Sequence, residues 1–96
     1  MITMFEEIRS YIAQCGGNYP TWYVGIASDP SDRLFNGHRV NSNGDAWIYR
    51  DCVSSISARQ TEQRLLAQGC KGGGGGGDSS TRFVYAYRIN AHTSEN

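Results

Sequence analysis

Residues 21–38 read TWYVGIASDPSDRLFNGH, and this stretch decides the fold of the chain. Its first seven residues, 21–27, are rich in aromatic and β-branched side chains, which is typical of a β-strand. Asp29 stands directly before a proline, the pattern of a helix N-cap followed by proline in the first turn. We therefore predict a strand over residues 21–27 and a short helix over residues 30–36, ended by Gly37.

The second half of the chain contains the same kinds of element. Residues 46–53 (AWIYRDCV) have the composition of a strand. A capping-box pattern, Ser57-x-x-Gln60, precedes apolar positions at helical spacing, which predicts a helix over residues 58–67. Residues 82–89 (RFVYAYRI) alternate strictly and predict a strand. One face of that strand should carry Phe83, Tyr85, Tyr87 and Ile89, and the other Arg82, Val84, Ala86 and Arg88.

The remaining segments lie at the ends and in one glycine-rich run. Thr3 and Glu6 form a capping-box pattern, so we predict an amphipathic helix over residues 4–14. Lys71 precedes six consecutive glycines. Ordering each glycine costs about 0.5–1 kcal/mol more than ordering alanine, which predicts a mobile connector over residues 71–78. A backbone nest for phosphate is the alternative for this run. The polar tail after Asn90 is expected to fray.

This order of elements predicts one α+β domain over residues 1–96. Its sheet should be three-stranded, mainly antiparallel or mixed, and flanked by three helices. A chain of 96 residues is too short for two independent cores without metals or disulfides. No internal repeat divides it.

Composition excludes several classes of protein. The longest apolar runs are only a few residues, far below the ~20 that span a bilayer, so we expect no membrane helix. The N-terminus carries acidic residues where a secretory signal needs a basic region, which argues against export. Three cysteines, Cys15, Cys52 and Cys70, lack the paired spacing of a zinc site. We expect reduced thiols in a cytoplasmic protein, with Cys52 packed in the interior and Cys70 exposed beside the glycine run.

The charges give a mixed indication about nucleic acid as a partner. The formal net charge is zero, which argues against phosphate binding. Between residues 33 and 88, however, eight basic residues stand against four acidic ones. A basic surface that binds nucleic acid and scattered solvated charge are both compatible with this distribution.

Four polar side chains could carry chemistry together. Tyr23, Arg33 and His38 surround the predicted strand-to-helix turn, and Glu62 lies on the later helix. Phosphodiester cleavage needs an arginine for the phosphoryl oxygens, a carboxylate for a divalent metal and a group that takes a proton from water. All three types are present.

Each of these side chains also has an ordinary structural explanation. A tyrosine on a strand often serves packing, and a histidine after a helix end favours the helix dipole. Arg33 could form an ion pair with Asp29 or Asp32, and Glu62 could form one with Arg59.

The pattern resembles the GIY-YIG nuclease family. Tyr23-Val24-Gly25, followed by Arg33, Leu34 and His38, is similar to the Y-I-G half of the signature and the helix after it. Residues 46–66 are similar to the family's next strand and to the helix that carries its metal-binding glutamate, here Glu62. The resemblance covers residues 21–67 and implies a small mixed sheet flanked by helices.

The resemblance also implies an endonuclease that hydrolyses nucleic acid with Mg²⁺ or Mn²⁺. In it, Arg33 would hold the scissile phosphate, His38 would assist proton transfer or substrate positioning, and Glu62 would bind the metal. Tyr23 is the tyrosine of the Y-I-G strand. We expect the substrate to contact Arg39 and Arg59 as well.

The family's G-I-Y strand has no counterpart ahead of Tyr23. We expect residues 82–89 to lie beside residues 21–27 and to supply the missing phenol through Tyr85 or Tyr87. Two other functions stay open: an inactive GIY-YIG-like module that binds nucleic acid or a protein partner, and a structural accessory domain. The sequence predicts no oligomeric state.

Overall fold

The computed structural model describes residues 3–72 and 80–95. Within those ranges, no helix combines the length and the apolar composition that a bilayer crossing requires. The elements in chain order are α1 (Met4–Gln14), the 3₁₀ turn η1 (Tyr19–Thr21), β1 (Trp22–Ala27), α2 (Pro30–Asp32), the π-helical turn η2 (Arg33–Gly37), β2 (Trp47–Asp51), α3 (Ser55–Gln68) and β3 (Phe83–Arg88). They confirm the predicted α+β class.

The last strand of the chain lies at the centre of the sheet. The strand order is β1-β3-β2, and β3 pairs antiparallel with both neighbours. Trp22 faces Arg88 at one end of the β1–β3 pair, and Ala27 faces Phe83 at the other. The expected pairing of residues 82–89 with residues 21–27 is therefore confirmed.

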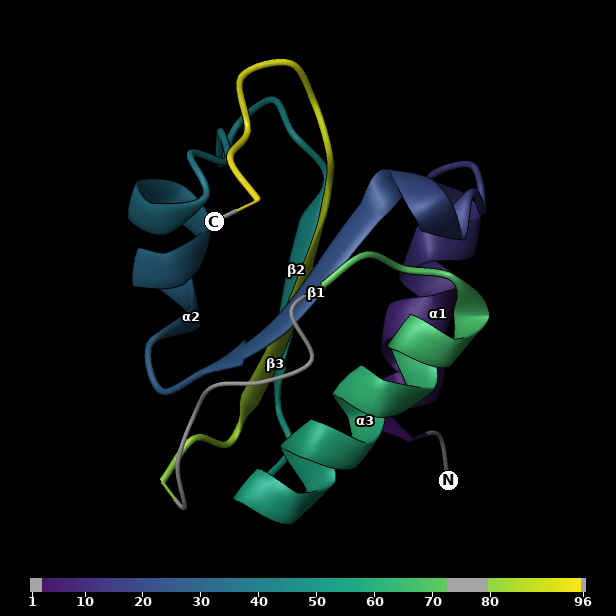
Figure 1. Ribbon diagram of the computed structural model, residues 1–96, viewed down its shortest axis with the longest axis vertical. Coiled ribbons are helices and arrows are strands. Elements are labelled where there is room, and N and C mark those ends of the chain that lie inside the picture. The colour runs from purple at the N-terminus through teal and green to yellow at the C-terminus, as the bar shows by residue number, and fades with distance from the viewer. Residues whose placement is uncertain (1–2, 73–79, 96) are drawn as a thin grey trace.

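Helices cover both faces of the sheet. In Figure 1, α1 and α3 lie on one side of the strands and α2 lies on the other. The side chains of β3 alternate between two cores as predicted. The core under α1 and α3 contains Ile8, Ile12, Trp22, Val24, Leu65, Val84 and Ala86. The core under α2 and η2 contains Ala27, Leu34, Val40, Tyr85 and Tyr87.

The N-terminal end of each α-helix is capped by a side chain that accepts a hydrogen bond from a backbone amide. The Thr3 hydroxyl accepts a hydrogen bond from the Glu6 amide at 3.1 Å, and the Asp29 carboxylate accepts one from the Asp32 amide at 3.1 Å, as predicted. The prediction for α3 was wrong by one turn. Its cap is the Ser54 hydroxyl, which accepts from the Ser57 amide at 3.1 Å, so the helix begins three residues before residue 58.

The second strand is shorter than predicted. It ends at Asp51, whose carboxylate accepts a hydrogen bond from the Val53 amide at 2.8 Å. Val53 has a φ of 71°, in the left-handed region that interrupts an extended chain, and is 80 % exposed. This local turn explains why residues 52–53 leave the strand.

The C-terminal segment packs against the domain instead of fraying. The Ser94 amide donates to the His38 carbonyl at 2.7 Å, and the Asn90 side chain donates to Asp45 at 3.0 Å. Figure 1 shows this segment running beside α2. The predicted fraying is wrong for the described part of the tail, because both side chains and backbone groups bond it to distant residues, which no local pattern reveals.

The glycine run starts along the outer edge of β1. The Lys71 amide donates to the Trp22 carbonyl at 2.8 Å, and the Val24 amide donates to the Lys71 carbonyl at 2.8 Å. The predicted mobility of residues 71–78 concerns mainly positions 73–78, which lie outside the described residues.

The three cysteines are free thiols. Cys52 is buried as expected, but the expectation of an exposed Cys70 is wrong, because its side chain is only 6 % exposed. Burial raises the pKa of the Cys70 thiol to about 11. A thiol of this kind is poorly reactive, since the thiolate is the nucleophile.

Candidate active site

A glycine in β1 allows a tyrosine of β3 to lie across the strand. Gly25 and Tyr85 are direct cross-strand partners. A Cβ at Gly25 would lie 2.5 Å from the Tyr85 hydroxyl oxygen and 2.6 Å from Cζ, closer than real Cβ contacts. Glycine at this position is therefore required for the Tyr85 ring to cross β1.

His38 is packed among three tyrosine rings at the end of η2. The distances between ring centroids are 4.9 Å to Tyr23, 5.4 Å to Tyr85 and 5.0 Å to Tyr87. The His38 amide donates to the Arg33 carbonyl at 2.8 Å and closes the π-helical turn. Because the residue is 0 % exposed, an interaction with the helix dipole alone does not account for its position.

The hydrogen bonds of His38 define its tautomer. Its Nδ1 lies 2.6 Å from the Ser94 carbonyl oxygen, which can only accept, so Nδ1 carries the proton. Burial lowers the pKa of His38, and the charge of Arg33 lowers it further, against the bond to Ser94. The ring is therefore neutral, and its Nε2 accepts from the Tyr85 hydroxyl at 2.8 Å. The Tyr87 hydroxyl donates to the same Ser94 carbonyl at 2.9 Å.

Arg33 is exposed, and its side chain donates a hydrogen bond to Tyr85 of this cluster. Burial raises the pKa of Tyr85, whereas a hydrogen bond from the Arg33 side chain and its positive charge lower it. The explanation of Arg33 by an ion pair is wrong, since it forms none with Asp29 or Asp32 in the described part of the chain. Those aspartates accept hydrogen bonds from an amide of the same turn and from Asn36.

Glu62 is a buried carboxyl on α3. Its side chain is 1 % exposed, and its Oε1 has no hydrogen-bond partner in the described residues. Burial raises the pKa of Glu62, and the charge of Arg59 lowers it. The expected pair with Arg59 is wrong only in its location: the carboxyl is buried, and the Arg59 charge acts on it there. The Glu62 charge also contributes to the raised pKa of Tyr85.

The structure brings most of the predicted site residues together. Tyr23, Arg33, His38, Tyr85 and Tyr87 form one cluster. Glu62 lies on α3, on the other side of the sheet from α2, and acts on this cluster through its charge on Tyr85. Of the two expected substrate contacts, Arg39 is exposed with a φ of 60°, and Arg59 lines a groove beside α3.

Two contributors were missed from the sequence. Gly25 was signalled by its place in Tyr-Val-Gly, but its contact with Tyr85 depends on strand register. Ser94 contributes a backbone carbonyl, for which no sequence signal exists.

One carboxyl group, that of Glu62, could hold a cation weakly. Within residues 3–72 and 80–95, no group of three or more His, Cys, Asp and Glu side chains forms a metal site. Mg²⁺ is commonly bound by one or two carboxylates and keeps several waters. The unpartnered Oε1 of Glu62 supplies one such ligand.

Comparisons of the chain with models of protein families, with curated proteins and with solved structures found no match.

Replacing Glu62 with glutamine is expected to stabilise the protein at neutral pH. Burial raises the folded-state pKa above the ordinary value of 4.5, so the folded protein binds the proton more tightly than the unfolded chain. The resulting loss of stability is absent below pH 4.5 and develops as the pH rises through the folded-state pKa. We expect Glu62→Gln to gain on the order of 1 kcal/mol at pH 7, because the amide removes the cost of burying a charge, although its own polar atoms gain no partner.

Urea unfolding of both proteins at a series of pH values measures this difference. The gain should disappear in acid, and Glu95→Gln on the exposed tail should show no comparable gain. Equal stability of Glu62→Gln and the parent at pH 7 would contradict the interpretation.

Proposed function

We propose that this chain is a GIY-YIG-like module that hydrolyses phosphodiester bonds of nucleic acid with a divalent metal ion. The observation that carries the proposal is the buried Glu62 carboxyl with its unpartnered Oε1, whose charge contributes to the raised pKa of Tyr85. A buried carboxyl oxygen without a hydrogen-bond partner is costly, and groups of this kind concentrate at functional sites.

Tyr85 and His38 provide a path for a proton. The Tyr85 hydroxyl donates to Nε2 of the neutral His38 ring. As that proton moves to Nε2, the phenol oxygen takes a proton from the water that attacks phosphorus. The Ser94 carbonyl, 2.6 Å from Nδ1, orients the ring and stabilises the imidazolium that forms.

Arg33 is suited to the phosphate itself. Its exposed guanidinium lies at the Tyr85 hydroxyl, where the attacking water would be held. A guanidinium fork can bind two phosphoryl oxygens at once. Its fixed charge then stabilises the negative charge that develops during transfer.

Glu62 would hold Mg²⁺ or Mn²⁺. The bound ion supplies Lewis-acid stabilisation of charge on the phosphoryl group. The low dielectric around the buried carboxylate would strengthen its attraction to a cation.

A fluorescent duplex incubated with Mg²⁺, with Mn²⁺ and with EDTA tests the proposal. We expect cleavage with either metal and none with EDTA. The second measurement is thermal unfolding, in which Mn²⁺ at ten times its Kd should stabilise the parent by about 1.4 kcal/mol and leave Glu62→Gln unchanged. No cleavage together with no Mn²⁺ shift would refute the metal-dependent nuclease.

The second candidate is a GIY-YIG-like module that binds without cutting. Burial raises the pKa of both Glu62 and Tyr85, which favours uncharged side chains at the cluster. Such a module would show neither cleavage nor the Mn²⁺ shift. Binding that weakens steeply with salt would identify nucleic acid as its partner, and indifference to salt would favour a protein.

A further inference from the structure

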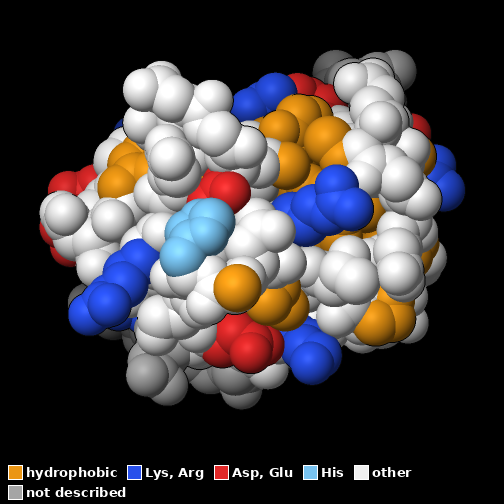
Figure 2. Space-filling model, turned by 90° about the horizontal axis from the view of Figure 1, so that it is seen from above, with side chains coloured by type: hydrophobic (Ala, Val, Ile, Leu, Met, Phe, Trp, Pro, Cys, Tyr) orange, Lys and Arg blue, Asp and Glu red, His pale blue; other side chains and the backbone are white. Residues whose placement is uncertain are grey.

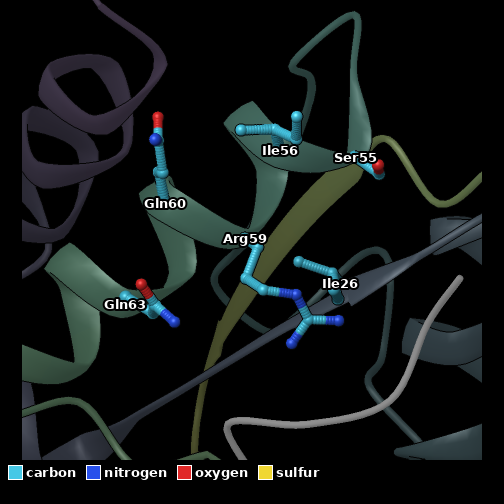
Figure 3. A pocket seen from close by; sticks show the side chains of 6 residues that line it. All are labelled: Ile26, Ser55, Ile56, Arg59, Gln60 and Gln63. Atoms are coloured by element: carbon cyan, nitrogen blue, oxygen red, sulfur yellow. The ribbon is translucent and has the colours of Figure 1, made fainter. Parts of the chain in front are cut away.

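A groove lies between the first half of α3 and the end of β1. Its volume is about 280 Å³, and Figure 3 shows the six side chains that line it: Ile26, Ser55, Ile56, Arg59, Gln60 and Gln63. One of the six is a cation and none is acidic. The groove therefore favours an anionic occupant.

The groove adjoins the candidate active site. Arg59 and Glu62 are three residues apart on α3, so they lie on the same side of the helix, and the Arg59 charge acts on the Glu62 carboxyl. Figure 3 shows the Arg59 guanidinium pointing away from α3 and towards β1 beside Ile26. Ile26 directly follows Gly25, over which Tyr85 lies.

The side chains of the groove match a sugar–phosphate strand. A guanidinium, a hydroxyl and two amides can donate hydrogen bonds to phosphate oxygens. Ile56 is 69 % exposed and offers an apolar contact for a sugar or base. The end of the molecule seen in Figure 2 shows basic side chains only at separate places, among acidic, apolar and uncharged groups of the described residues.

We propose that the groove lined by Arg59, Ser55 and the two glutamines binds the nucleic-acid strand next to the bond that is cut. The inference rests on the proposed function and adds the surface that would bind the substrate strand beside Glu62 and Arg33. Arg59 contacts one phosphate of the backbone, and Ile26 and Ile56 contact the adjoining sugars.

Fluorescence anisotropy in EDTA tests the groove without cleavage. The probes are a fluorescein-labelled duplex and its single strand, each as DNA and as RNA. Arg59→Ala should weaken binding about tenfold and reduce the slope of log K against log salt by about 1, the effect of one lost phosphate contact. Arg64→Ala is the matched control, because Arg64 lies on the same helix but packs over the Phe5 ring at 4.0 Å. It should bind as the parent does.

A second variant separates lost binding from lost folding. The first turn of α3 carries no acidic residue, and Ser55 is its first position. Ser55→Asp adds a charge that the helix dipole favours, so the unfolding temperature should stay equal or rise. The same charge repels a phosphate, and we expect binding to weaken about tenfold.

The outcomes separate this proposal from the nuclease. If Arg59→Ala and Ser55→Asp bind every probe as the parent does, the groove is not the binding site, even where the parent cuts the duplex. If both variants lose binding while the parent never cuts, the groove is a binding site for nucleic acid, and the proposed nuclease activity is wrong. A parent that binds none of the four probes overturns the groove proposal.

Discussion

Replacing Arg33 with alanine is expected to slow cleavage of a duplex by about 10³-fold. The guanidinium lies at the Tyr85 hydroxyl, where it would neutralise charge on the transferring phosphoryl group. Arg33 is exposed, so its loss should cost only its hydrogen bond to Tyr85, about 0.5–1.5 kcal/mol of the free energy of unfolding. Cleavage rates at saturating substrate and metal measure the effect.

Two variants make the Arg33 experiment specific. Arg33→Lys keeps the charge but lacks the planar fork, so it should recover only part of the lost rate. Arg88→Ala removes the same charge from an exposed position of β3 and should cut as the parent does. A rate for Arg33→Ala equal to that of Arg88→Ala would show that cleavage occurs at another site or comes from a contaminant.

Replacing Tyr85 with phenylalanine is expected to slow cleavage by about 10²–10⁴-fold, the usual contribution of general acid–base catalysis. The variant keeps the ring that lies over Gly25 and removes only the hydroxyl that donates to Nε2 of His38 at 2.8 Å. Single-turnover cleavage rates would isolate the chemical step from binding.

The Tyr85 variant also has a structural cost that must be separated from catalysis. It leaves the buried Nε2 of His38 without a donor, which costs about 1–3 kcal/mol. Rates should therefore be compared well below the unfolding temperature of each protein. Tyr49→Phe is the matched control, because Tyr49 pairs with Tyr85 across the strands while its ring contacts Trp47 and Phe83. If Tyr85→Phe cuts as fast as Tyr49→Phe, Tyr85 does not transfer the proton.

The position of β3 explains how the cluster can form without a strand ahead of Tyr23. The resemblance to GIY-YIG nucleases calls for a tyrosine-bearing strand beside the Tyr-Val-Gly strand. Here that place belongs to β3, from the other end of the chain, and the register sets Tyr87 opposite Tyr23. The expectation that Tyr85 or Tyr87 approaches the other site residues agrees with the hydrogen bonds of both hydroxyls around His38.

Local patterns in the sequence determined the helices and strands of this protein. The caps at Thr3 and Asp29, the alternation of residues 82–89 and the aromatic run at residues 21–27 were sufficient, because hydrogen bonds and side-chain direction over a few residues produce them. The errors at the start of α3 and the end of β2 are also local. In each, a serine or aspartate a few residues before the predicted boundary made a competing hydrogen bond.

Only the tertiary structure decided the site. The burial of Glu62, the neutral tautomer of His38 and the passage of Tyr85 over Gly25 each depend on residues far apart in the chain. The Ser94 carbonyl lies 56 positions from His38 and belongs to a backbone whose chemistry is the same at every residue. Desolvation and long-range hydrogen bonds depend on what packs around a group, and the order of residues does not state this.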